Sequence, residues 1–228
     1  MALHCRLLTD NFFLYFYRMY NVPHFKASSQ EEVIAFMKAN PFIVLCGVDE
    51  NNIPVATHVP VLLREEGGKI FLQAHIMRKQ KHTNAFASNT NVLCIFSAAH
   101  TYVSASWYSK KNIGSTWNYQ AVHATGVIKF LDEDGLRSLL TRLTDTFEAN
   151  PHSPSLFKDM EEEYIQRMMA AIIAFEVEIT NIEHIFKLSQ NRDNESYDNI
   201  VHELKKKGGE AEQIADIMAE RKDKVFPA

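Results

Sequence analysis

A short basic stretch is the first group of residues that could bind a ligand. Arg78, Lys79 and Lys81 supply three positive charges with no acid among them, where a strand is expected to end and a helix to begin. Cationic side chains and free backbone N–H groups at the start of a helix are what a phosphate group requires. A solvated surface turn has the same composition, so the rest of the chain must decide between the two interpretations.

A second group combines aromatic and amide side chains. Residues 116–120 read Thr-Trp-Asn-Tyr-Gln, an unusual succession for an ordinary strand. A flat heteroaromatic ring such as a flavin favours apolar contacts on its faces and amide donors and acceptors along its polar edge. Trp117, Asn118 and Gln120 fit that description, although such aromatic residues also occur in cores and interfaces. A further polar cluster, residues 187–192, is by composition alone a loop with capping residues.

Histidines are abundant, but their spacing does not favour a metal site. His58, His75 and His123 lie within strand-like runs, among ten histidines in the chain. A zinc site needs three or four ligands, commonly with two of them close together on one element. No H-x-H, H-x-x-x-H or C-x-x-C motif occurs. We therefore expect no metal, and a hydrogen-bonded core histidine is an equally good interpretation of each one.

The composition is that of a globular protein with one large domain or two small ones. The chain has 228 residues and a formal net charge of −4, and a chain of this length can bury a core without disulfide or metal cross-links. Only eight glycines are present, and no glycine-rich nucleotide-binding motif occurs. Cys5, Cys46 and Cys94 are not spaced for disulfides, so we expect a cytoplasmic protein.

The first 18 residues are expected to be an N-terminal extension to the core. The apolar run at 11–17 is far too short to span a membrane, and it lacks the small-residue cleavage site of a signal peptide. A second methionine, Met19, precedes the first well-organised segment. An extra strand or arm that packs on the core is the alternative interpretation of residues 1–18.

The elements that must position these groups are short strands with helices between them. Capping-box spacing at 28–32 begins a helix that Asn40-Pro41 ends. Strands are expected at 42–48, 53–63, 69–75, 91–98, 101–108, 116–130, 173–179 and 182–188, and further helices within 78–88, from 132 onward, and at about 160–171, 197–207 and 210–222. About eight strands with short links indicate a closed antiparallel barrel with helical decorations, a mainly β architecture of the α+β class.

Four strings of residues resemble those of the PaiB-like family, which belongs to the FMN-binding split-barrel superfamily and whose members are often labelled negative transcriptional regulators. The strings are THVP at 57–60, YVSASWY at 102–108, STWNYQAVHATG at 115–126 and KLSQNR at 187–192. Their order and spacing match from about Met19 to Leu204. The chain departs from the family pattern where Gln80-Lys81 replaces Asn-Pro, at the expected phosphate end, and where Ala98-Ala99 replaces Gly-Pro.

The resemblance implies an antiparallel split β-barrel and a homodimer with FMN bound between its subunits. Residues 19–190 would form the barrel, and residues 191–228 a C-terminal helical tail. The implied cofactor-binding residues are Arg78 and Lys79 at the phosphate, Thr57, His58 and His75 on the barrel side, Trp117, Asn118 and Gln120 at the ring, and Lys187 and Gln190 closing the site.

Three functions remain open at this point. The first is a flavoprotein with or without reductase activity, and since a flavin supplies redox chemistry itself, the sequence does not tell an enzyme from a binding protein. The second is a transcriptional regulator that acts through DNA or a partner protein. Direct DNA binding is disfavoured because the chain is acidic and residues 187–228 carry eight basic and nine acidic side chains. The third is a haem-binding split barrel with an axial histidine. No membrane partner is expected.

Overall fold

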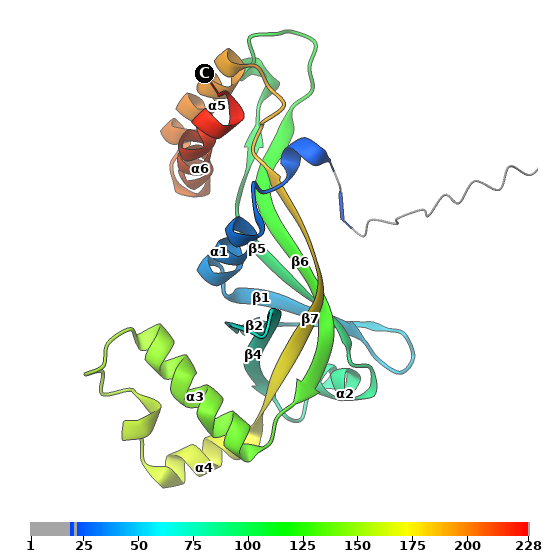
Figure 1. Cartoon of the computed structure of the whole chain (residues 1–228), viewed down its shortest axis with the longest axis vertical. Helices are drawn as coiled ribbons and strands as arrows, with labels where there is room; N and C mark the ends of the chain where they lie inside the picture. Colours follow the sequence, from blue (N-terminus) through cyan, green and yellow to red (C-terminus); the bar gives the residue numbers. More distant parts are fainter. Residues whose placement is uncertain (1–18, 21, 228) are drawn as a thin grey trace, which may run out of the picture.

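The structure is a computed structural model that describes residues 19–20 and 22–227. These residues form one seven-stranded sheet, six α-helices and three short 3₁₀ turns. The expected extension at 1–18 lies outside the described residues. Figure 1 shows an elongated molecule in which two strands run along most of the long axis and helices gather at both ends.

The sheet is curled into a split barrel. Its neighbouring strands pair antiparallel in the order β2-β1-β5-β6-β7-β4-β3. The two edge strands, β2 and β3, are consecutive in the chain, and only Val61 separates them. The sheet must therefore curl until its two edges meet, and the fold class predicted from the sequence is confirmed. The strands are β1 Phe42–Val48, β2 Pro54–Pro60, β3 Leu62–Glu66, β4 Lys69–Met77, β5 Asn91–Val103, β6 Thr116–Phe130 and β7 Ile172–Lys187.

Three strand boundaries differ from those expected, which gives seven strands instead of about eight. The run at 53–63 is two strands, because Pro60 has no N–H to continue a ladder and the chain turns a corner at Val61. The segment 91–108 is one strand that ends at Val103, since an extra residue between Ser97 and His100 forms a β-bulge without ending the ladder. A second bulge, opposite residues 125–126, likewise keeps β7 continuous.

Six helices cover the ends and one side of the barrel. The side chains of Ser29, Asp132 and Asp193 accept N–H groups in the first turns of α1, α3 and α5, which fixes where these helices begin. Figure 1 places α5 and α6 together at one end of the molecule and α3 and α4 together at the other. The helices are α1 Gln30–Ala39, α2 Lys81–Ser88, α3 Glu133–Glu148, α4 Glu162–Ala171, α5 Asn194–Lys207 and α6 Gly209–Val225.

Helices at both ends of the barrel contribute side chains to its core. Helix α2 packs on β1 and β2, and its fully buried Phe86 lies so close to Gly47 that a Cβ there would be 2.8 Å from the ring. At the other end, α6 contacts β5, and its buried Ile214 and Met218 join the same apolar cluster as the inner face of the sheet. The C-terminal helices therefore share the core of the barrel.

A second apolar cluster lies on the outer face of the sheet. It joins the apolar stripes of α3 and α4 to Ile172 and Ala174 of β7. This helix pair thereby covers the outside of β7 near its first residues. In the part of the chain that the structure describes, no helix is long and apolar enough to cross a membrane.

A substitution at Gly126 tests the close packing of β6 on β7. A Cβ at this position would lie 2.3 Å from the carbonyl oxygen of Glu178, and neither strand can retreat without breaking the ladder. We expect Gly126→Ala to lower the free energy of unfolding by about 2–3 kcal/mol, as overpacking does, in urea titrations. Gly114→Ala is the matched control, because nothing lies within 4 Å of its Cβ. Equal unfolding midpoints for the two variants would contradict the close approach.

Candidate functional site

The basic stretch forms an exposed turn between β4 and α2, which we call the basic turn (residues 78–81). Arg78 is partly committed to the fold: its Nη2 donates to the carbonyl of Ile172 at 2.8 Å, and its backbone N–H to that of Ala171 at 2.9 Å. Lys79 and Lys81 make no hydrogen bond or ion pair with any described residue. The two lysines are therefore the cations most available to a ligand here.

Helix α2 adds backbone donors to the basic turn. Its N-cap residue, Gln80, makes no side-chain hydrogen bond to the first turn, and that turn contains no acidic residue. The first N–H groups of a helix have no partner within the helix. With two lysines beside them, they suit an anion such as a phosphate.

The three residues expected on the barrel side do not form one group. Thr57 is opposite the fully buried Leu45, so it faces the interior, whereas the next residue, His58, is exposed and stacks on Phe42 at 6.0 Å between ring centroids. His75 is opposite Ala174, on the face that α3 and α4 cover. Partial burial lowers the pKa of His75 below its ordinary value, which favours the neutral imidazole. Among the described residues, no cluster of three or more potential ligands could hold a metal.

The ring-facing residues expected on β6 divide between its two faces, because successive side chains of a strand point in opposite directions. Trp117 is 51% exposed, whereas Asn118 is fully buried. The Asn118 amide donates to Sδ of Met218 at 3.3 Å and accepts from Oγ of Ser189 at 3.0 Å. Asn118 is therefore bound beneath α6 and is not on the face that Trp117 presents.

Trp117 lies in a hollow of about 880 Å³, which we call the aromatic groove. The His100 ring stacks on it, with 5.7 Å between centroids and 27° between planes, and Tyr102 meets it edge-on at 6.1 Å and 72°. Gln120, although 7% exposed, also reaches the groove. The residues that line the groove are Ala39, Asn40, Pro41, Phe42, Ser97, Ala98, His100, Trp117, Tyr119, Gln120, Ala121 and Glu210.

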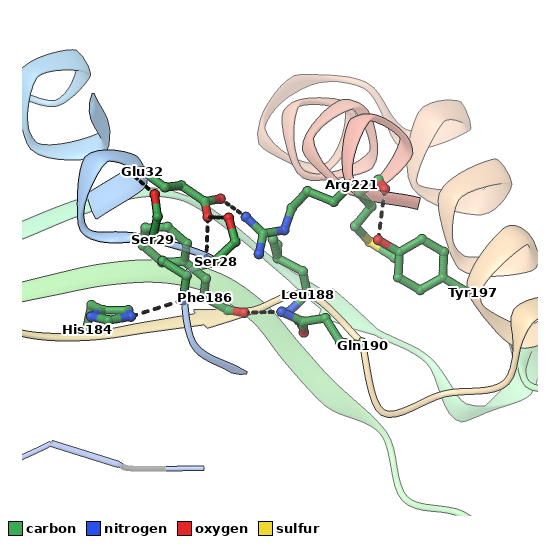
Figure 2. Close-up of polar contacts among 11 residues, drawn as sticks. Ser28, Ser29, Glu32, His184, Phe186, Leu188, Gln190, Tyr197 and Arg221 are labelled. Atoms are coloured by element: carbon green, nitrogen blue, oxygen red, sulfur yellow. Dashed lines mark hydrogen bonds and ion pairs between the residues drawn. The ribbon is translucent and has the colours of Figure 1, made fainter. Parts of the chain in front are cut away.

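Lys187 and Gln190 hold the end of β7. The ammonium group of Lys187 donates to the hydroxyl of Thr116, and burial lowers its pKa. The amide of Gln190 donates to the carbonyl of Phe186 and accepts the N–H of Leu188 at 2.7 Å, as Figure 2 shows in part. Both side chains thus have partners within the fold, and they support the groove rather than line it.

An ion pair ties α6 to α1 (Figure 2). The guanidinium of Arg221 donates to Glu32, and the other carboxylate oxygen of Glu32 accepts both the N–H and the hydroxyl of Ser28 at 2.7 Å. Arg221 also lies over the ring of Phe186, and its burial lowers its pKa. This tie holds α6, which brings Met218 over Asn118 and Glu210 to the groove.

Sequence reasoning missed Phe42, His100 and Glu210, which line the groove, and Tyr102, which packs on Trp117 beside it. A signal for two of them exists in the sequence, because His100 and Tyr102 alternate along β5 and pair with Tyr119 and Trp117 of β6. Glu210 comes from α6, far along the chain, and no local pattern connects it to β5 or β6.

The basic turn and the aromatic groove lie at opposite ends of β7. Arg78 bonds to Ala171 and Ile172 at the start of the strand, whereas Tyr119 is opposite Lys187 at its end. Sixteen residues at 3.3 Å each give about 50 Å of strand between them. Figure 1 shows β7 running along the molecule from α4 toward α5, so the two groups are far apart within one chain.

Comparisons with known proteins point to one family. Residues 19–181 match the model of a family described as "Putative FMN-binding domain". The protein named Protease synthase and sporulation protein PAI 2 of Bacillus subtilis (strain 168) is 30% identical over 204 residues, which cover 89% of this chain and 98% of that protein. An uncharacterised protein of Saccharomyces cerevisiae is 32% identical over 100 residues, which cover 41% of this chain and 59% of the yeast protein.

Solved structures share the fold. The FAD and haem binding protein from Mycobacterium smegmatis superposes with a TM-score of 0.53 at 18% identity, covering 71% of this chain and 72% of that one. A conserved hypothetical protein from Mycobacterium tuberculosis superposes with a TM-score of 0.50 at 10% identity, covering 74% and 90%. At these identities the similarity establishes the fold alone.

Glu32→Gln tests the tie between α1 and α6. The change removes the negative charge beside Arg221, whose side chain is only 12% exposed. We expect the free energy of unfolding to fall by about 2–3 kcal/mol, somewhat less than for a fully buried pair, in urea titrations. Glu220, the exposed neighbour of Arg221 that makes no hydrogen bond or ion pair with any described residue, provides the control. Glu220→Gln should leave the unfolding midpoint unchanged. If both variants were as stable as the parent, α6 would not depend on this ion pair.

Proposed function

We propose that the chain, which belongs to the family of FMN-binding domains that residues 19–181 match, binds FMN between two copies of itself. FMN is the cofactor that the family model indicates. The distance between the basic turn and the aromatic groove is the observation that supports a site shared by two copies. About 50 Å of strand divides them, much more than the length of an FMN molecule. If both contact one FMN, a second copy must supply one of them.

A two-fold arrangement satisfies this requirement. In a symmetric dimer, the groove of each subunit meets the basic turn of the other, and two equal sites result. Each site then combines a phosphate-binding end from one chain with a ring-binding end from its partner.

The phosphate end of the proposed site is the basic turn. Lys79, Lys81 and the uncapped start of α2 would hold the phosphate, with Arg78 contributing the donors that Ile172 does not engage. Arginine and lysine suit phosphate oxygens because charge strengthens each hydrogen bond. Gln80-Lys81, the departure from the family pattern, places an additional cation here.

The ring end of the proposed site is the aromatic groove of the second copy. Trp117 would lie against the flavin, and the Gln120 amide would bond to its polar edge, while Asn118, Lys187 and Gln190 keep β6 and β7 in place. When bound, FMN supplies the capacity to accept and donate electrons. The protein's own part is to bind the phosphate, orient the ring and exclude water.

The dimer would form on the outer face of β1 and β5. Val44, Leu93 and Ile95 are half-buried there, with Val44 directly opposite Ile95, and none of them belongs to an apolar cluster of the described residues. Phe42, on the same face of β1, is 62% exposed. An apolar patch of this kind, surrounded by polar residues, is typical of a subunit contact.

Two alternatives are separated by the absorption spectrum of the purified protein. A yellow protein supports FMN, a sharp Soret band would support a haem-binding barrel with an axial histidine, and a colourless protein that takes up neither would support a regulator without flavin chemistry. The acidic net charge disfavours direct DNA binding.

We also propose a cytoplasmic location, with which the free thiols of Cys46 and Cys94 are consistent.

Removing the lysines of the basic turn tests the phosphate end. We expect Lys79→Ala and Lys81→Ala each to weaken FMN about tenfold, and the double variant about a hundredfold, because each removes one charge-assisted contact. Riboflavin, which lacks the phosphate, should bind the variants and the parent alike. Fluorescence titration of both ligands makes the comparison, with the exposed Lys158→Ala as control. Unchanged FMN affinity in the double variant would place the phosphate elsewhere.

Ile95→Glu tests the proposed dimer surface. A charge at the centre of an apolar contact lacks a partner there, so we expect the variant to sediment as a monomer at micromolar concentrations where the parent is a dimer. Tyr164→Glu is the control, since Tyr164 is 47% exposed on α4, away from the outer face of β1 and β5. A monomeric parent, or a dimeric Ile95→Glu variant with normal FMN binding, would refute this surface.

A further inference from the structure

A hollow of about 460 Å³ lies between the end of α1, the start of β3 and the last turns of α3, and we call it the α1–α3 pocket. None of the side chains that would hold FMN lines it. Its volume is within the range of small-molecule sites. The pocket is therefore open to a ligand of its own.

Apolar side chains form much of the wall of the pocket, because two apolar clusters meet there. Met37 and Val61 belong to the cluster of the barrel interior, whereas Leu62 packs against the cluster that α3 and α4 form on the outer face. Phe147, in the last turn of α3, also lines the pocket, belongs to neither cluster and is 50% exposed. An apolar group in the pocket would remove part of this surface from water, which is favourable.

Arg142, on α3, brings a positive charge without a counter-charge to this apolar wall. Its side chain is half-buried, and its Nη1 donates to Oε1 of Gln73 on β4 at 2.6 Å. Gln73 is only 7% exposed and its own amide donates to Glu176, so the acceptor is held in place. Nε and Nη2 of Arg142, which share the other edge of the planar group, make no hydrogen bond or ion pair with any described residue.

The other two cations of the pocket are already neutralised. The ammonium group of Lys38 lies 2.7 Å from a carboxylate oxygen of Glu65. Arg64 pairs with two carboxylates, one of them that of Glu176 at 3.0 Å. Of the three cations that line the pocket, Arg142 is therefore the one available to an anion from solution.

Asp145 is the acid that lines the pocket. It lies three residues after Arg142 on α3, so the two side chains are neighbours on the helix surface. Asp145 is nevertheless exposed and forms no ion pair with any described residue. Because water screens an exposed carboxylate, it opposes the binding of an anion beside it only weakly.

From these groups we infer that the α1–α3 pocket binds a small carboxylate with an apolar body. The free edge of the Arg142 guanidinium offers two parallel N–H donors, the geometry that a carboxylate matches. The apolar body lies against Met37, Leu62 and Phe147. An inorganic anion would leave this wall in water, and a neutral apolar molecule would leave the guanidinium without a partner. The inference does not rest on FMN binding, because the pocket lies within one chain and apart from the proposed FMN site.

Four small probes test this inference. 3-Phenylpropanoate has both parts of the proposed ligand, 3-phenylpropanamide is its neutral counterpart, 3-phenylpropylamine is a cation of similar shape, and acetate is a carboxylate without the apolar body. The ¹³C-methyl signals of the methionines, assigned with single Met→Leu variants of the full chain, report where each probe binds. Met37 lines the pocket, whereas Met218 lies beside Asn118 and outside the pocket lining, so it is the internal reference.

We expect 3-phenylpropanoate to shift the Met37 signal saturably and the Met218 signal hardly at all. The amide should bind about tenfold more weakly, because it lacks the charge-assisted contact with Arg142, and neither the amine nor acetate should saturate in the same concentration range. Arg142→Gln should remove the preference for the carboxylate over the amide. Arg167→Gln is the matched control and should keep that preference, since Arg167 is exposed on α4 and outside the pocket lining.

A second variant keeps the inference testable if Arg142→Gln loosens α3. Asp145→Asn removes the exposed acid beside Arg142, so it should strengthen 3-phenylpropanoate about two- to threefold and leave the amide unchanged. A damaged fold would not produce such a gain. Equal binding of the carboxylate and the amide to the parent, no saturable shift at Met37, or the same affinities in Asp145→Asn as in the parent would overturn the inference.

Discussion

The long antiparallel ladder between β6 and β7 is the interaction on which the rest of the structure depends. The two strands pair from Tyr119 and Lys187 at one end to Phe130 and Phe175 at the other. Each also pairs with the next strand of the barrel, β6 with β5 and β7 with β4. The ladder therefore fixes where both halves of the barrel lie. Its close approach at Gly126 leaves no space for a side chain, so the register of the two strands is set there.

The ladder also sets the distance between the groups that can bind a ligand. The basic turn follows β4 and is bonded to the start of β7, whereas the aromatic groove lies beside the end of β7 and the start of β6. Helices then complete each end: α2 places Phe86 against Gly47 near the basic turn, and α6 covers Asn118 near the groove. Each end thus has its own helix packed on the sheet. Neither is positioned to reach the other within a chain, and the proposal of a shared site follows from that separation.

The sequence alone predicted the barrel because its signals are local. Capping residues such as Ser29 and Asp132 begin helices where expected. The strand expected at 53–63 is two strands, because Pro60 has no N–H to continue the first ladder. The β-bulges were not predictable, since a bulge near Ala98 depends on how β6 pairs with β5. The prediction of eight strands failed at these bulges for that reason.

The candidate site was predictable only in part, for a similar reason. The spacing that identified the basic turn and residues 116–120 is local. The alternation that separates Trp117 from Asn118 follows from strand geometry, but the partners that bind Asn118 come from α6 and from the loop after β7. Likewise, the bond from Arg78 to Ile172 joins distant segments, and so does the approach of Glu210 to His100. Contacts of this kind are decided by packing rather than by sequence spacing.

Mixing two defective chains tests the central claim, that one FMN is held by two copies of the chain. One chain carries Lys79→Ala with Lys81→Ala and the other carries Trp117→Ala, so each homodimer has two damaged sites. After subunit exchange, the heterodimer has one intact site and one doubly damaged site, and an equal mixture should bind FMN at the parent's affinity in about a quarter of its sites. If heterodimers form, as differently tagged chains would show, and no site regains that affinity, the phosphate and ring groups belong to one chain and the shared site is contradicted.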